Sequence, residues 1–340
     1  MSSKGSKHWN AIWSDRSEHS MRILVTAPYP VDRLTELESW FGTVIYQPWI
    51  DRGAAYTAAE LTALIKETQA DALITELDEL TQDVINAWEP KPRFVAICRA
   101  TPSNIDVQAL RRQGIPLITA PTRNIQAVAE LLIGNVISFY RHASRSEKWL
   151  KEGNWTDWLY PYKEFRGQQL SEKKVGIVGL GAVGRRAARL FEAFSCDISY
   201  FDPYVSAEDF PQYKPASLQE IFSANEIVSV HLPSTPETKR LISRELLELL
   251  PQDSLFVNTS RASVVDTEAL IDILESKKIR GAVLDVFDHE PPEEQDMRLV
   301  RLENVLATPH IAGSTEEVVH NHAALINNAL AEWKGTWAAR

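Results

Sequence analysis

The stretch KVGIVGLGAVG, residues 174–184, decides the fold class. It joins a short apolar strand to Gly179, Gly181 and Gly184, spaced as GxGxxG. In a dinucleotide-binding unit the first glycine allows a tight turn, the second lets the backbone approach a pyrophosphate, and the third lets the next helix pack on the strand. An ordinary strand–turn–helix with accidental glycines would read the same, so the context has to separate the two interpretations.

The context favours a dinucleotide. The next apolar run ends in YFDP, and Asp202 lies 23 residues after Gly179, where an acid can accept a hydrogen bond from a ribose 2′-hydroxyl. The alternative is that Asp202 only caps the turn before Pro203. A carboxylate here would repel the 2′-phosphate of NADP, and residues 203–206 contain no Arg or Lys to neutralise it. The sequence therefore predicts NAD.

Strand and helix patterns alternate twice, from Met21 to Pro121 and again from Lys174 to Pro309. This alternation predicts an α/β fold with two Rossmann-like domains, each built on a parallel sheet. The first series has no glycine-rich phosphate loop. A long apolar helix is expected over residues 124–152, an aromatic-rich loop over 154–165 and a final helix over 314–333.

Composition excludes several classes of protein. The chain has 340 residues, enough for about two domains, and a net charge of −10 without a basic block, so a nucleic-acid surface is not expected. The sequence contains no run of about 18 apolar residues, so a membrane span is not expected. Residues 1–20 lack an apolar core and are expected to be a flexible extension. The two isolated cysteines predict no metal site and a reducing compartment, the cytoplasm.

Three polar residues follow strands of the second series: Arg261, Glu290 and His310. Ligands of open parallel sheets bind beyond the carboxyl ends of the strands. There an Arg can bind a carboxylate through two hydrogen bonds, a His can exchange a proton with a carbinol oxygen, and an acid can orient that His. With a hydride carrier, this set suits a 2-keto acid reductase. Each residue could instead serve only a turn or a surface ion pair, and spacing leaves open whether Asp285, Asp288 or Glu290 meets His310.

Several stretches together resemble the D-isomer-specific 2-hydroxyacid dehydrogenase family: GIVGLGAVGR, YFDP, HLPSTPETKRLI, VNTSRASVVD, GAVLDVFDHEPP and ATPHIAGST. The resemblance implies that Arg261 binds substrate, that His310 is the general acid/base and that Glu290 is its partner. It also implies that Asp285 lies near the nicotinamide carboxamide. The cofactor-binding residues expected are Gly179, Gly181, Ala182, Val183, Gly184, Asp202, Leu232, Pro233, Thr259, Ser260, Arg261, Asp285, His310 and Gly313.

The resemblance also implies an architecture. Residues 21–122 and 312–340 would form the substrate domain, and residues 123–311 would form an inserted NAD-binding domain. The helix after Asn124 would support a homodimer. The aromatic residues of the following loop could line a substrate entrance or pack against a partner, and packing is favoured because aromatic side chains bury large areas at interfaces. These residues are Trp155, Trp158, Tyr160, Tyr162 and Phe165.

The turn expected to bind the substrate departs from the family pattern. Its sequence is CRATPSNID, so Arg99, Ala100 and Thr101 replace glycines, although backbone amides near Ala100 and Thr101 could still hold the keto acid. Arg123 stands in the next turn. One hypothesis is that Arg99 or Arg123 recognises a second anionic group on the substrate, such as a phosphate or carboxylate. The alternative is that both brace their loops through backbone carbonyls.

Two other functions remain open on the sequence. A formate- or phosphite-type dehydrogenase would share the fold, although Glu290 before Pro291 counts against the formate branch, which lacks that acid. An NAD-sensing, corepressor-like binding protein could retain the same residues. Turnover with a 2-keto acid separates both from a reductase.

Overall fold

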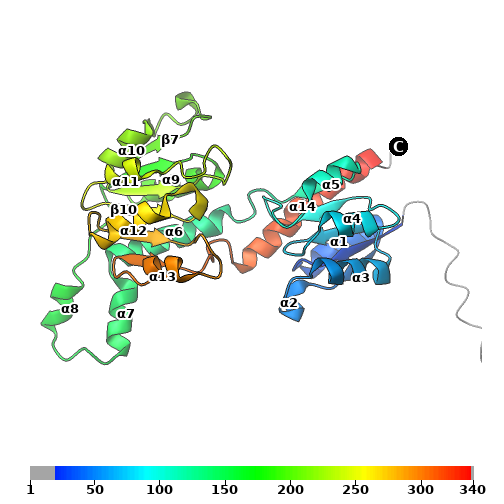
Figure 1. Cartoon of the computed structure of the whole chain (residues 1–340), viewed down its shortest axis with the longest axis horizontal. Helices are drawn as coiled ribbons and strands as arrows, with labels where there is room; N and C mark the ends of the chain where they lie inside the picture. The colour runs from blue at the N-terminus through cyan, green and yellow to red at the C-terminus, as the bar shows by residue number, and fades with distance from the viewer. Residues whose placement is uncertain (1–19, 338–340) are drawn as a thin grey trace, which may run out of the picture. The chain divides into compact units, whose positions relative to one another are not determined.

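The structure is a computed structural model that describes residues 20–337, and side chains as far as Lys334. The extension expected at the N-terminus lies, except for Ser20, outside the described residues. The chain forms two compact units (Figure 1). Unit 1 combines the chain up to Arg123 with the chain from Thr315, and unit 2 is Asn124–Ser314. Unit 2 is thus inserted into unit 1, which explains why the glycine motif begins halfway along the chain.

Unit 1 is built on a five-stranded parallel sheet of order β2-β1-β3-β4-β5. Helices cover both of its faces, and the sheet edge carries no glycine-rich loop. Its elements are β1 (Met21–Val25), α1 (Val31–Phe41), β2 (Gly42–Tyr46), α2 (Trp49–Arg52), α3 (Ala58–Thr68), β3 (Ala72–Thr75), α4 (Gln82–Ala87), β4 (Val95–Ile97), α5 (Val107–Arg112), β5 (Leu117–Thr119) and α14 (Glu316–Trp337).

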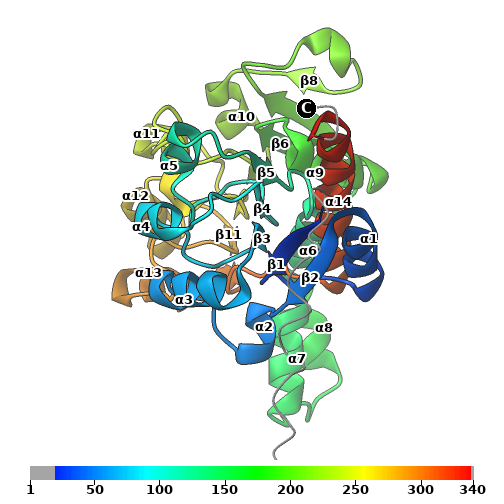
Figure 2. The same ribbon diagram turned by 90° about the vertical axis from the view of Figure 1, so that its right-hand side faces the viewer.

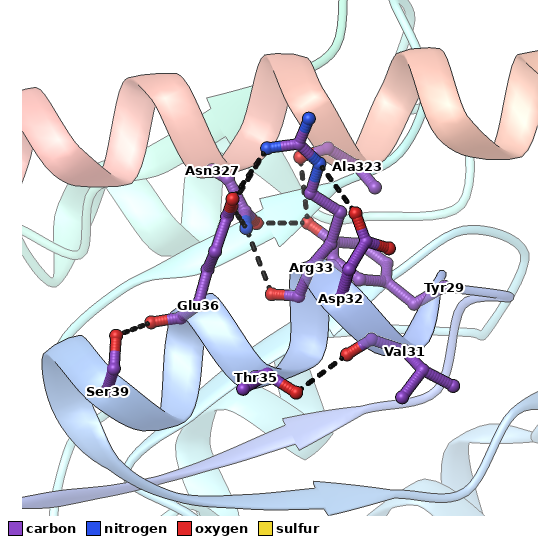
Figure 3. Close-up of polar contacts among 9 residues, drawn as sticks. All are labelled: Tyr29, Val31, Asp32, Arg33, Thr35, Glu36, Ser39, Ala323 and Asn327. Atoms are coloured by element: carbon purple, nitrogen blue, oxygen red, sulfur yellow. Dashed lines mark hydrogen bonds and ion pairs between the residues drawn. The ribbon is translucent and has the colours of Figure 1, made fainter.

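The last helix, α14, completes the core of unit 1. Its apolar side packs against α1 and the sheet, with Ala323, Ile326 and Leu330 fully buried. Asn327 ties the helices together, because its Oδ1 accepts a hydrogen bond from the Tyr29 hydroxyl at 2.8 Å and its Nδ2 donates to the carbonyl oxygen of Arg33 at 3.0 Å (Figure 3). Buried polar groups need such partners, so this contact fixes how α14 sits on unit 1.

Unit 2 contains a seven-stranded parallel sheet of order β12-β11-β10-β9-β6-β7-β8. Apolar side chains of α6 and α9 cover one face, and those of α10, α11 and α12 cover the other. Its elements are α6 (Ile125–Tyr140), α7 (Ala143–Lys151), α8 (Leu159–Glu164), β6 (Lys174–Val178), α9 (Ala182–Ala193), β7 (Asp197–Phe201), β8 (Lys214–Pro215), α10 (Leu218–Ala224), β9 (Ile227–Val230), α11 (Arg244–Glu248), β10 (Leu255–Asn258), α12 (Thr267–Glu275), β11 (Gly281–Leu284), α13 (Glu294–Val300) and β12 (Val305–Ala307), with 3-10 turns at Ala207–Asp209 and Ala262–Val264.

The α/β class with two parallel sheets is confirmed, but the single helix expected over 124–152 is wrong. The helix ends at Tyr140, and α7 begins after His142, whose φ of 55° is left-handed and cannot continue an α-helix. The expected aromatic loop contains α8, which lies beside α7 away from the sheet of unit 2 (Figures 1 and 2). Trp149 and Tyr160 stack between the two helices at 5.5 Å. Within residues 20–337, no helix combines the length and apolar character needed to cross a bilayer.

Candidate active site

The three glycines of the loop after β6 have different surroundings. Gly179 has φ of 92°, and a Cβ there would come within 2.8 Å of the His231 carbonyl oxygen. A Cβ on Gly184 would overlap the carbonyl oxygen of Gly179, so this glycine lets α9 approach the strand. A Cβ on Gly181 would meet no atom within 4 Å. The fold therefore does not need a glycine at 181, whereas a pyrophosphate lying on the loop would.

Asp202 connects the end of β7 to this loop. The Leu180 amide donates to its Oδ2 at 2.8 Å, and the Tyr204 amide donates to its Oδ1 at 2.9 Å. Asp202 therefore caps a turn, as the simpler interpretation held, and also lies against the glycine loop. Each carboxylate oxygen can accept a second hydrogen bond, so the acid can still receive a ribose hydroxyl.

A row of residues crosses the carboxyl edge of the sheet in register. Gly179, His231, Thr259, Asp285 and Thr308 directly follow β6, β9, β10, β11 and β12, whose last residues are paired. Two atoms in this row, His231 Nδ1 and Thr259 Oγ1, are buried without a hydrogen-bond partner among the described residues. Since buried polar atoms are almost always paired, the row fits a ligand that forms hydrogen bonds. His231 was missed from the sequence, although it directly precedes Leu232 and Pro233.

His310 and Glu290 form a pair at this edge. His310 Nδ1 lies 2.5 Å from Glu290 Oε2, and the two side chains are 41% and 38% exposed. The Phe287 amide donates to Glu290 Oε1 at 3.2 Å, which fixes the carboxylate. The other acids left open by the sequence face elsewhere, because Asp288 accepts a hydrogen bond from Thr267 and Asp285 is buried beneath the His310 turn.

Arg261 begins the short 3-10 turn after β10 and is exposed. Its guanidinium donates to the carbonyl oxygen of Ser260 at 2.6 Å, and no carboxylate in residues 20–337 pairs with it. Asn258, which sequence reasoning missed, shapes the turn: its Oδ1 accepts from the Ser260 amide at 2.9 Å and its Nδ2 donates to the Arg261 carbonyl oxygen at 2.9 Å. The arginine is therefore held at the sheet edge with its charge available to an anion.

The remaining expected cofactor residues lie on the same edge of unit 2. Ala182 and Val183 open α9. Leu232 is buried after β9, while Pro233 beside it is exposed. Gly313 follows the His310 turn, where a Cβ would overlap the Asn124 side chain.

The candidate arginines of unit 1 are placed differently. Arg123 forms an ion pair with Glu76, and the two side chains are only 14% and 11% exposed. The Arg123 guanidinium also lies 3.3 Å from His322 Nδ1, and burial lowers the pKa of His322, so this neighbour is neutral near pH 7. The charge of Arg123 is thus already matched by a carboxylate. Arg99 is half-buried, and its carbonyl oxygen accepts from the Ala120 amide at 3.1 Å.

Ala100 and Thr101 are exposed in the turn after β4. No group of His, Cys, Asp and Glu side chains in the described part of the chain could hold a metal ion.

Comparisons of sequence and fold identify relatives of this chain. Residues 133–312 match the family described as D-isomer specific 2-hydroxyacid dehydrogenase, NAD binding domain. The chain is 53% identical over 317 residues to YoaD of Bacillus subtilis, whose name places it among 2-hydroxyacid dehydrogenases, covering 93% of this chain and 92% of that protein. It is 34% identical to the hydroxypyruvate reductase of Thermotoga maritima, covering 76% of this chain and 82% of the relative.

Among solved structures, D-lactate dehydrogenase from Aquifex aeolicus, complexed with NAD and lactic acid, has the same fold, with a TM-score of 0.72 at 21% identity. The alignment covers 92% of this chain and 95% of that one. This chain belongs to the D-isomer-specific 2-hydroxyacid dehydrogenase family. It is an NAD-dependent oxidoreductase whose unit 2 contains the NAD-binding domain.

Proposed function

We propose that the enzyme interconverts a 2-keto acid and the corresponding D-2-hydroxy acid. The observation that carries this proposal is the joint presence, at one sheet edge of unit 2, of the His310–Glu290 pair, the glycine loop, and Arg261, which pairs with no carboxylate of the described chain. A proton donor, an anion receptor and a dinucleotide loop at the ends of β12, β10 and β6 are what a keto-acid reduction requires.

In this proposal, Arg261 binds the substrate carboxylate and polarises the neighbouring carbonyl. Because Nδ1 of His310 faces Glu290 at 2.5 Å, Nε2 is the nitrogen that gives its proton to the carbonyl oxygen during reduction and takes it back during oxidation. Glu290 holds the ring in that orientation. NAD, when bound, carries the hydride exchanged with C2 of the substrate.

We propose that backbone amides near Ala100 and Thr101, which are exposed in the turn after β4, also take part in binding the keto acid. The pairing of Arg123 with Glu76 favours a bracing role for Arg123, through a carboxylate and not the backbone carbonyls expected from the sequence, over recognition of a second anion. Because Glu76 already neutralises Arg123, a substrate with a single carboxylate, bound by Arg261, is favoured.

The test is a panel of 2-keto acids with one or two anionic groups, assayed by loss of NADH absorbance with NADPH as the control cofactor. We expect turnover with NADH, and we expect His310→Gln to lower kcat by about 10²–10⁴-fold while the Kd for NADH changes less than about twofold. A near-normal kcat in that variant would remove His310 from the chemistry. Tight NADH binding without turnover of any keto acid would favour an NAD-sensing protein.

We also propose a cytoplasmic homodimer. Three large aromatic side chains on or near α8 are exposed: Trp155 (59%), Trp158 (79%) and Tyr162 (77%). Monomeric proteins rarely expose apolar groups gathered in this way, so a partner subunit is expected to cover them. Both cysteines are buried and unpaired, as in a reducing compartment. Sedimentation of the wild type and of Trp158→Ala tests the assembly, since a wild-type monomer would contradict it.

A further inference from the structure

Asp285 is a buried carboxylate with an unusual set of partners. It directly follows β11 and is fully buried, yet no Lys, Arg or His of the described chain forms an ion pair with it. A buried charge is tolerated only when hydrogen bonds replace the water it has lost. The groups that supply those hydrogen bonds therefore show what the carboxylate holds in place.

The three groups of the described chain that donate hydrogen bonds to the Asp285 carboxylate all come from the turn that carries His310. The Thr308 hydroxyl donates to Oδ1 at 2.5 Å, and the Ile311 amide donates to the same oxygen at 3.0 Å. The Ala312 amide donates to Oδ2 at 2.8 Å. One donor precedes His310 and two follow it, so a single carboxylate fixes both sides of the turn.

The turn needs such a restraint. His310 has φ of 52°, a left-handed conformation that a residue with a Cβ adopts only when its surroundings impose it. The His310 amide donates to the Thr308 carbonyl oxygen at 3.0 Å, which tightens the turn. Hydrogen bonds to an ionised acceptor are stronger than those between neutral groups, so Asp285 is suited to hold this conformation.

We propose that Asp285 is a positioning residue for His310: its carboxylate clamps residues 308–312 and so aims the imidazole. The inference rests on the proposed role of His310 as acid/base, and it differs from a contact with the nicotinamide carboxamide alone. A cofactor contact would act mainly through NADH affinity. A positioning residue acts mainly through kcat, because misplacing a catalytic group by about 1 Å can cost about a hundredfold in rate.

The test uses the Thr308 hydroxyl, which supports the clamp. Thr308→Val keeps the shape and removes one donor to Asp285, whereas Thr308→Ser keeps the hydroxyl. Thr267→Val is the matched control, since Thr267 donates a similar hydrogen bond, at 2.6 Å, to Asp288 and not to the His310 turn. For each variant, kcat and KM for the keto acid and the Kd for NADH, by fluorescence titration, are measured.

We expect Thr308→Val to lower kcat about tenfold, the loss expected for one charge-assisted hydrogen bond, with the Kd for NADH within about twofold of wild type. Thr308→Ser should recover kcat to within about twofold, and Thr267→Val should leave it unchanged. Asp285→Asn, in which an amide replaces an acceptor facing donors, should lower kcat about a hundredfold.

A wild-type kcat in Thr308→Val would overturn the proposal. So would an Asp285→Asn variant whose kcat is retained at saturating NADH while its Kd for NADH rises, because the carboxylate would then serve the cofactor. If Asp285→Asn does not fold, the comparison of the Val and Ser variants at 308 still tests the clamp. The proposed function is tested separately by His310→Gln: loss of kcat there with a normal Thr308→Val rejects only the positioning role.

Discussion

The glycine loop allows a test that separates folding from cofactor binding in one motif. Gly184 and Gly181 are three residues apart, yet their surroundings are opposite. A Cβ at 184 would overlap the Gly179 carbonyl oxygen, whereas a Cβ at 181 would meet nothing within 4 Å. Gly181→Ala should therefore keep the stability of the wild type, and Gly184→Ala should be less stable.

The magnitudes follow from those contacts. In Gly184→Ala the obstacle is backbone, so α9 must move away from β6, which disturbs the buried face formed with Ala187, Ala188 and Phe191. Overpacking of this kind costs about 1–3 kcal/mol, a drop in Tm of roughly 2–12 °C for a unit of this size. In Gly181→Ala the φ of −70° suits alanine, so stability should change by less than about 1 kcal/mol.

The affinity for NADH, in contrast, should fall in Gly181→Ala without a matching loss of stability. The new methyl in Gly181→Ala projects into the space that a pyrophosphate would occupy, so the Kd for NADH should rise at least about tenfold with little change in stability. Urea denaturation without cofactor and fluorescence titration with NADH measure the two effects. A Gly181→Ala variant that binds NADH like the wild type, or a Gly184→Ala variant that is as stable as the wild type, would refute the reasoning.

Three further predictions concern charge. Arg261→Lys should raise KM for the keto acid about 10–100-fold, because a point charge replaces a two-pronged contact; an unchanged KM in steady-state kinetics would contradict the assignment. Glu76→Gln should leave the largely buried Arg123 guanidinium without its carboxylate and lower the free energy of unfolding by about 1–3 kcal/mol, while an unchanged stability in urea denaturation would argue against the bracing role. Burial lowers the pKa of His231 to about 4, so the unfolded chain binds more protons below about pH 6.5 and stability falls as the pH drops, by about 2 kcal/mol from pH 7 to pH 5. His231→Asn should flatten that dependence in urea denaturation, and an unaltered slope would exclude the histidine as its source.

The fold could be predicted because it depends on local sequence patterns. Strand–helix alternation and the glycine spacing depend on neighbouring residues, so both could be read from the sequence. The end of the long helix could not, because His142 has a left-handed backbone that no glycine marks. Helix pattern alone favours continuation there, and the turn is visible only in the folded chain.

Contacts between residues far apart in the sequence could not be predicted either. Arg123 and Glu76 are 47 residues apart and meet only because β3 and β5 end at the same sheet edge. Strand-end position was enough to suggest Arg261 and His310 as candidates. It could not reveal that Asn258 shapes the arginine turn, because that role depends on the conformation of three consecutive residues.

The path of the chain through α14 has a consequence for its synthesis. Tyr29 and Asn327 are separated by 298 residues, and the helix that completes the core of unit 1 is made only after the whole of unit 2. Unit 2 is continuous and has its own core, so it can fold while the ribosome is still translating the message. Until α14 is made, the apolar face of this sheet is covered by α1 alone, and the surface that later receives Ala323, Ile326 and Leu330 stays exposed. A chaperone that binds apolar segments of nascent chains would therefore find its target on this face of unit 1.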